Sequence, residues 1–186
     1  MKTSTTSGVP EGRTAGGNTR IKPSGALALV QAAMIAALYV VLTVLANSLG
    51  LASQAIQVRF SEALTILPFF TPAAIPGLYV GCILANLLTG SALWDIVFGS
   101  IATLLGALGT YAVGRLPFQR KKWLTPLPPI LANTLIIPWI LSLVYQLEGS
   151  IPYFMLTVGV GEIISCGILG MVLLLALEKH AARIFH

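Results

Sequence analysis

Six long apolar runs, separated by short breaks that hold most of the charged residues, dominate this sequence. The runs cover residues 26–46, 55–70, 72–88, 92–113, 126–146 and 152–177. A membrane-spanning helix needs about 20 mostly apolar residues, and most of these runs come close to that length. Only 9% of the chain is charged, whereas soluble domains carry about 25% charged residues. We therefore predict an all-α, polytopic integral membrane protein with six transmembrane helices.

The positive charges predict how these helices are oriented. Of the eleven basic residues, ten fall in residues 1–25, 115–125 and 178–186, and the remaining one is Arg59. Cytoplasmic segments of membrane proteins carry an excess of Lys and Arg. Six spans with both termini in the cytoplasm place all ten of these residues on the inside. The net charge of +5 therefore indicates topology, and we expect no nucleic-acid partner.

The chain divides into one membrane domain and two tails. Residues 1–25 are rich in Thr, Ser and Gly and precede any apolar run. A signal peptide has a short apolar core close to its start, so we expect a disordered cytoplasmic tail here instead. Residues 26–177 form the predicted six-helix substrate-binding domain. Residues 178–186 form a predicted cytoplasmic C-terminal tail.

Polar residues inside this apolar background predict a binding site. Charged groups in membrane segments are costly unless they pair with another group or bind a ligand. The candidate substrate-binding residues are Arg59, Glu62, Asn86, Trp94, Asp95 and Glu162. Carboxylates accept hydrogen bonds from N–H groups, an amide both donates and accepts, and an aromatic ring offers a flat face. We expect a pocket, open to the outside, that suits a planar, nitrogen-rich or cationic solute.

Simpler roles stay open for several of these residues. Arg59 and Glu62 are three positions apart on one helical face and also fit an internal ion pair, while Asp95 also fits a helix cap. The two cysteines, Cys82 and Cys166, fit the role of small buried hydrophobic residues. The sequence has no spacing typical of a metal site, a nucleophile–base pair or a phosphate-binding loop. We expect no metal, no cofactor and no enzymatic activity.

Small residues recur at four-residue spacing in the first apolar run. Ala32 and Ala36 form one ridge, and Ala33 and Ala37 form a neighbouring ridge. Small residues at this spacing let a second helix approach closely, which favours helix association in lipid. Alanine is also common in membrane helices, so the spacing alone leaves both interpretations open.

Three stretches of the chain resemble one known family. They are VRFSEALTILPFFTPAAIPGLYVGCILANLLTG, AAMIAALYVVLT in the first apolar run and GEIISCGILG in the last. These stretches are similar to the QueT family, the predicted queuosine-precursor-binding (S) components of energy-coupling-factor (ECF) transporters. The resemblance covers residues 26–177. It implies a six-helix S component, in the plasma membrane of a prokaryote, that captures a 7-deazaguanine-type precursor of the tRNA base queuosine outside the cell.

The resemblance also implies partners. S components of this kind work with a transmembrane coupling subunit and two ABC-type ATPase subunits. Their first span docks on the coupling subunit through small residues, and Ala32, Ala33, Ala36 and Ala37 match that pattern here. The alternative is a solitary secondary carrier or facilitator for a small planar or cationic metabolite, with Glu162 as its proton site.

Overall fold

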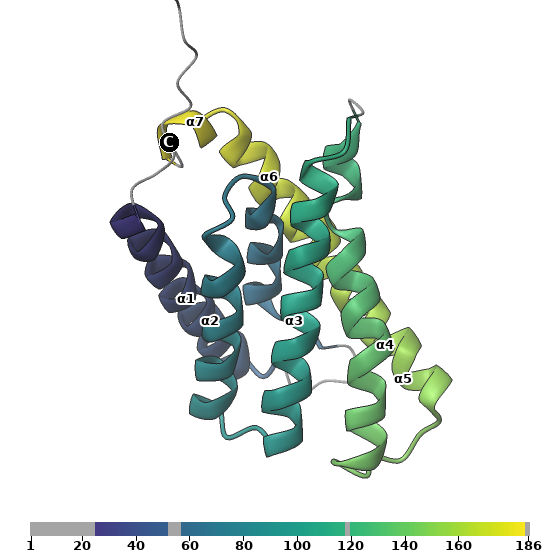
Figure 1. The fold of residues 1–186 in the computed structure, drawn as a ribbon. Coiled ribbons are helices and arrows are strands. Elements are labelled where there is room, and N and C mark those ends of the chain that lie inside the picture. The colour runs from purple at the N-terminus through teal and green to yellow at the C-terminus, as the bar shows by residue number, and fades with distance from the viewer. Residues whose placement is uncertain (1–24, 52–56, 118–119, 185–186) are drawn as a thin grey trace, which may run out of the picture.

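The computed structural model describes residues 25–51, 57–117 and 120–184, and all regular structure in these ranges is helical (Figure 1). The helices are α1 (Gly25–Ser48), η1 (Phe60–Phe69), α2 (Ala74–Leu88), α3 (Leu93–Gly114), η2 (Lys121–Leu124), α4 (Leu127–Leu143), α5 (Ile151–Glu162), η3 (Ile163–Leu169), α6 (Gly170–Glu178) and α7 (Ala181–Ile184). The helices α5, η3 and α6 follow one another without a break and form a single rod of 28 residues. The described part of the chain therefore contains six main helical rods, which confirms the predicted all-α membrane fold.

The six rods differ in length. Four of them, which begin at Gly25, Leu93, Lys121 and Ile151, are long and apolar enough to cross a membrane. The other two are shorter than the runs predicted for them, because η1 begins at Phe60 rather than residue 55 and α2 begins at Ala74 rather than residue 72. They reach only about 20 Å each, against a bilayer core of about 30 Å. The end of the bundle where η1 begins and α2 stops can therefore hold a polar pocket, since irregular backbone is tolerated at membrane depth where it lines a cavity.

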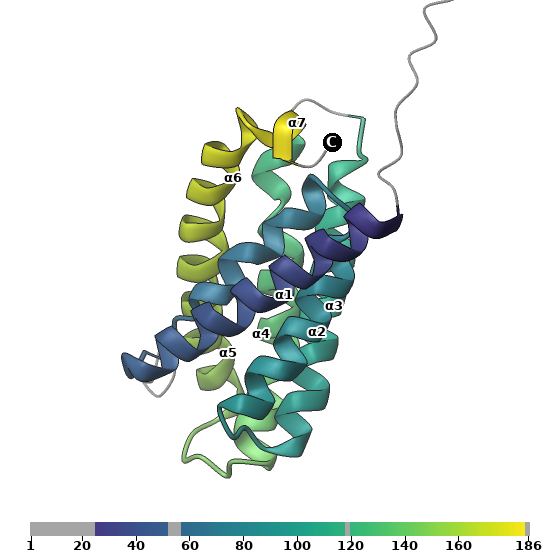
Figure 2. The same ribbon diagram turned by 90° about the vertical axis from the view of Figure 1, so that its left-hand side faces the viewer.

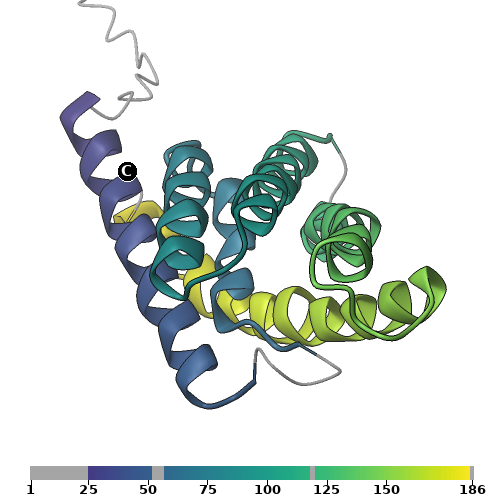
Figure 3. The same cartoon turned by 90° about the horizontal axis from the view of Figure 1, so that it is seen from below.

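The helix η1 lies at the centre of the bundle. Every residue from Ser61 to Pro68 is buried, and η1 contacts α1, α2, α3, η3 and α6. The view along the bundle shows η1 enclosed by these neighbours (Figure 3). Its ten residues form a 3₁₀ helix, which is long for a type that is normally found in short pieces. A 3₁₀ helix rises about 2 Å per residue, so η1 carries its polar residues further into the bundle than an α-helix of equal length.

The helix α1 crosses α2 at a slant and packs directly on its backbone (Figure 2). Gly77 and Gly81 of α2 make this approach possible: a Cβ on Gly77 would lie 2.7 Å from the carbonyl oxygen of Ala32, and one on Gly81 would lie 3.0 Å from the Cα of Ala36. Ala36 is only 8% exposed. The ridge of Ala32 and Ala36 is therefore used inside the chain, and the expectation that it docks a partner is not supported by its position.

The neighbouring ridge faces outward. Ala33 and Ala37 are both exposed, and Ala37 lines an apolar groove with Met34, Leu38 and Val41. The two alanine ridges, which look equivalent in the sequence, thus have different environments in the fold. In the described part of the chain, the ridge of Ala33 and Ala37 is therefore left exposed to contact another helix.

The two ends of the bundle differ in charge. The start of α1, the connection between α3 and α4, and the end of α6 lie at one end (Figure 1). The described residues of the basic segment from Arg115 to Lys122 belong to this end, and Lys122 forms an ion pair with Glu178 at 3.0 Å. The predicted N-terminal tail lies outside the described residues except for Gly25, where α1 begins. The predicted C-terminal tail contains α7, whose Ile184 carbonyl accepts a hydrogen bond from Gln31 of α1 at 3.4 Å.

Candidate functional site

A polar pocket of about 350 Å³ opens at the other end of the bundle, where α1, α2 and α4 end and η1 and α3 begin. Its lining residues are Thr43, Ala46, Asn47, Gln57, Arg59, Asn86, Thr89, Ser91, Asp95, Ile137, Leu141, Tyr145 and Leu147. Small-molecule sites in proteins typically measure about 300–1,000 Å³ and combine apolar walls with a few well-placed polar groups. This pocket has both features.

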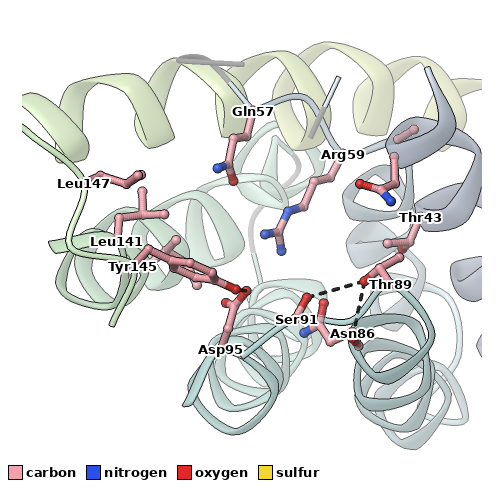
Figure 4. A pocket seen from close by; sticks show the side chains of 13 residues that line it. Thr43, Gln57, Arg59, Asn86, Thr89, Ser91, Asp95, Leu141, Tyr145 and Leu147 are labelled. Atoms are coloured by element: carbon pink, nitrogen blue, oxygen red, sulfur yellow. Dashed lines mark hydrogen bonds between the residues drawn. The ribbon is translucent and has the colours of Figure 1, made fainter. Parts of the chain in front are cut away.

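The guanidinium of Arg59 points into this pocket (Figure 4). The backbone N–H of Arg59 donates to Ser165 Oγ at 3.1 Å, which anchors the residue at the start of η1. Among the residues that the structure describes, its guanidinium has no hydrogen-bond or ion-pair partner, so the predicted alternative of an Arg59–Glu62 ion pair is not formed. The guanidinium stays positively charged at any accessible pH, and its five N–H donors are therefore available to a ligand.

Asp95 forms the opposite side of the pocket. It lies in the first turn of α3, where a carboxylate interacts favourably with the helix dipole. Tyr145 donates its O–H to Asp95 Oδ2 at 3.1 Å and accepts the backbone N–H of Ala92 at 3.1 Å. Burial raises the pKa of Tyr145 above its ordinary value, so the phenol keeps its proton at neutral pH and remains a donor. This contact links the end of α4 to the start of α3 across the pocket.

Two carboxylates lie further inside the bundle, in a group that we call the deep cluster: Tyr39, Glu62, Asn133, Glu162 and Cys166. Glu62 is 1% exposed and Glu162 is 8% exposed. Tyr39 donates to Glu62 Oε1 at 2.6 Å, and the thiol of Cys166 donates to Glu162 Oε2 at 3.1 Å. One carboxylate oxygen each of Glu62 and Glu162 and the sulfur of Cys166 lie within 4.8 Å of one another.

Two atoms of the deep cluster lack hydrogen-bond partners in the described structure. They are Glu62 Oε2 and Asn133 Nδ2, although the Asn133 amide faces both carboxylates closely enough to act on the charge of each. A buried polar group without a partner costs about 1–3 kcal/mol. Glu162 is also followed directly by the π-helical turn η3, and π-helical turns within α-helices are frequent at functional sites.

The predicted substrate-binding residues separate into three locations. Arg59, Asn86 and Asp95 line the pocket, whereas Glu62 and Glu162 belong to the deep cluster. The structure does not bring Trp94 to either place: it is 57% exposed and stacks on Phe98 with ring centroids 5.9 Å apart. It lines a separate apolar hollow together with Trp139.

Sequence reasoning missed several polar contributors to this region, including the pocket-lining Thr43, Asn47, Thr89 and Ser91. Tyr39, Tyr145 and Gln57 were not predicted as site residues, and Cys166 was interpreted only as a small buried residue. A usable signal existed for Tyr39, because a hydroxyl in the middle of an apolar run needs a buried partner. No such signal existed for Tyr145, because its contact with Asp95 joins residues 50 positions apart.

A close approach of α5 fixes the segment that carries Gln57 and Arg59, and it supports a prediction. A Cβ added to Gly161 would collide with the carbonyl oxygen of Gln57, whereas one added to Gly167 has its nearest neighbour 3.7 Å away. We expect Gly161→Ala to shift this segment and lower thermal stability by about 1–3 kcal/mol. Gly167→Ala, the matched control, should change little. Thermal unfolding of both purified variants checks this, and equal stability would contradict the described packing.

Comparison with known proteins identifies the family. A family model described as QueT transporter matches residues 29–179, which is most of the chain. A curated relative from Lactococcus lactis, named queuosine precursor transporter QueT, is 34% identical over 103 residues. That alignment covers 55% of this chain and 57% of the relative. No solved structure matches the chain. The match over residues 29–179, on a helical membrane fold with a polar pocket, shows that the chain belongs to the QueT transporter family.

Proposed function

We propose that this protein is the substrate-binding component of an ECF-type importer and captures a queuosine precursor of the 7-deazaguanine type. The observation that carries the proposal is the polar pocket in which the guanidinium of Arg59, which has no partner among the described residues, faces the buried carboxylate of Asp95. The name of the curated relative supports the substrate class. The family match supports a role in transport rather than in a chemical reaction.

The pocket is chemically suited to such a ring. A guanine-type edge presents a ring N–H and an exocyclic amine side by side, and one carboxylate such as Asp95 can accept both. The ring also carries a carbonyl oxygen, to which the Arg59 guanidinium can donate. Asn86 adds an amide beside them, and Ile137 and Leu141 supply apolar surface for the faces of the ring.

The proposed direction of transport is inward across the plasma membrane of a prokaryote. The described basic residues lie mostly at the end of the bundle opposite the pocket, and Lys and Arg favour the cytoplasmic side. The pocket then faces outward. The sequence holds no motif for ATP hydrolysis, so a coupling subunit and two ABC-type ATPases would supply the energy, with the Ala33–Ala37 ridge as the proposed docking surface.

A ligand screen tests the proposed substrate. In a thermal-shift panel of deazapurines, nucleobases and vitamins, we expect a deazaguanine to raise the melting temperature of the purified protein. A ligand at 100 times its Kd stabilises the folded state by about 2.7 kcal/mol. A clear shift with a vitamin, together with no shift for any deazaguanine, would overturn the substrate assignment.

A second candidate function is a solitary proton-coupled carrier. The observation in its favour is the deeply buried Glu162 beside Glu62, because buried carboxylates in membrane transporters often relay protons. Co-purification from native membranes separates the two candidates. An ECF component brings ATPase subunits with it, whereas a solitary carrier does not and transports substrate when reconstituted alone.

A further inference from the structure

The deep cluster continues the pocket into the centre of the bundle. On three elements, a pocket-lining residue lies one helical turn from a member of the cluster. The pairs are Thr43 and Tyr39 on α1, Arg59 and Glu62 at η1, and Ile137 and Asn133 on α4. The side chains of Thr43 and Ser61 are joined by a hydrogen bond of 2.8 Å at this level. A ligand in the pocket therefore has the deep cluster beneath it.

The charges around this region are unbalanced. Three buried carboxylates, those of Glu62, Asp95 and Glu162, face one guanidinium, that of Arg59, in the described part of the chain. The other polar groups around the two deep carboxylates are Tyr39 on α1, Cys82 on α2, Asn133 on α4 and Cys166 on η3. None of these four groups carries a positive charge. An added cation would therefore relieve the repulsion between the two deep carboxylates.

A ligand at this point is also indicated by the unpaired atoms. Asn133 is 4% exposed, and among the residues that the structure describes its Nδ2 has no hydrogen-bond partner, although its amide faces Glu62 and Glu162. Glu62 Oε2 likewise has no partner. Buried polar atoms in proteins are almost always satisfied. An unsatisfied carboxylate oxygen, Glu62 Oε2, beside a second buried carboxylate favours a bound donor group at this place.

We propose that Glu62 and Glu162 form a cation subsite beneath the pocket, which selects ligands that carry a protonated amine over neutral analogues with the same ring. The proposal rests on the proposed function, because the ring is held by the pocket above. An ammonium group offers three N–H donors, and charge-assisted hydrogen bonds to buried carboxylates are among the strongest in proteins. For a deazaguanine, the fitting substituent is an aminomethyl group.

A metal ion suits the deep cluster less well. The thiol of Cys166 donates a hydrogen bond to Glu162 Oε2 and so keeps its proton, whereas metals bind the thiolate rather than the thiol. Within the described residues, the group offers only three His, Cys, Asp or Glu ligands, whereas structural zinc sites use four. An organic ammonium needs neither a thiolate nor a fixed coordination number.

The test uses a matched pair of ligands on the full-length purified protein. The Kd of a 7-aminomethyl-7-deazaguanine is compared with that of the 7-cyano analogue, which has the same ring and no positive charge. We expect the wild-type protein to prefer the amine by roughly 10- to 100-fold. Glu62→Gln and Glu162→Gln should each remove most of this preference, measured as the ratio of the two Kd values. Glu148→Gln, in an exposed loop, is the control and should keep it.

Each outcome decides one of the two proposals. Equal affinity for both ligands, or a preference that survives in both Gln variants, overturns the subsite but leaves the proposed function standing. Stabilisation by zinc alone, lost in Cys166→Ser, assigns the cluster to a metal and also overturns it. Binding of neither deazaguanine overturns the proposed function. In that case the subsite is tested by comparing the affinities of benzylammonium and benzyl alcohol. A preference for the amine that is lost in Glu62→Gln and Glu162→Gln supports the subsite. Equal affinity for the two probes overturns it.

Discussion

Replacing Ala37 with Trp is expected to abolish uptake of the substrate in cells while leaving its binding to the purified protein unchanged. Ala37 is exposed on the outer face of α1, away from the pocket. In lipid, helices associate by close packing of small residues, and an indole group on the Ala33–Ala37 ridge would hold a partner helix away. Co-purification with the coupling subunit, uptake of labelled substrate and affinity of the isolated protein are measured on the same variant.

Two control variants show whether the effect of Ala37→Trp is specific to the Ala33–Ala37 ridge. Leu105→Trp places the same bulky group on the exposed outer face of α3 and should leave assembly and uptake intact. Ala36→Trp should instead destabilise the fold, because Ala36 packs against the backbone of Gly81. If Ala37→Trp still assembles and transports normally, the docking role of this ridge is wrong.

Replacing Arg59 with Gln is expected to weaken substrate binding by about 2–5 kcal/mol, a loss of roughly 30- to 5,000-fold in affinity. The guanidinium points into the pocket and has no partner in the described part of the chain, and its loss also leaves the carboxylates around it without a counter-charge. The fold should survive, because η1 is anchored through the backbone N–H of Arg59 and Ser165. Calorimetric titration measures the affinity.

The matched control for this variant is Arg120→Gln. Arg120 is exposed at the opposite, basic end of the bundle, so its removal alters the net charge equally without reaching the pocket. We expect its affinity to equal that of the wild type. Equal losses in both variants would show that Arg59 acts only through the overall charge of the protein and not as a pocket residue.

The positions of the six helical rods could be predicted from the sequence, but which side of each rod packs against its neighbours could be predicted less well. Apolar length located all six, and the cost of burying charge indicated Glu62 and Glu162 as inward-facing groups, which are 1% and 8% exposed. Periodicity could not tell Ala36 from Ala37, because either ridge of α1 could have packed on α2. Only the glycines at positions 77 and 81 on α2 select between them.

The details of the site depend on contacts between distant parts of the chain. Trp94 and Asp95 are adjacent in the sequence, yet Trp94 is exposed and Asp95 is buried, because one turn of α3 presents them to different surroundings. The 3₁₀ geometry of η1 and the π turn after Glu162 also have no clear signature in residue type. Both backbone forms are set by the helices packed around them.

A calorimetric titration with two ligands tests whether the pocket recognises the guanine-type edge of a deazapurine. The purified protein is titrated with 7-deazaguanine and with 7-deazahypoxanthine, which lacks the exocyclic amine. A site built to hydrogen-bond an N–H group rejects an analogue without it. We expect saturable one-to-one binding of 7-deazaguanine and an affinity lower by at least about tenfold for the analogue. Equal affinity for the two ligands, or no binding of either, would contradict it.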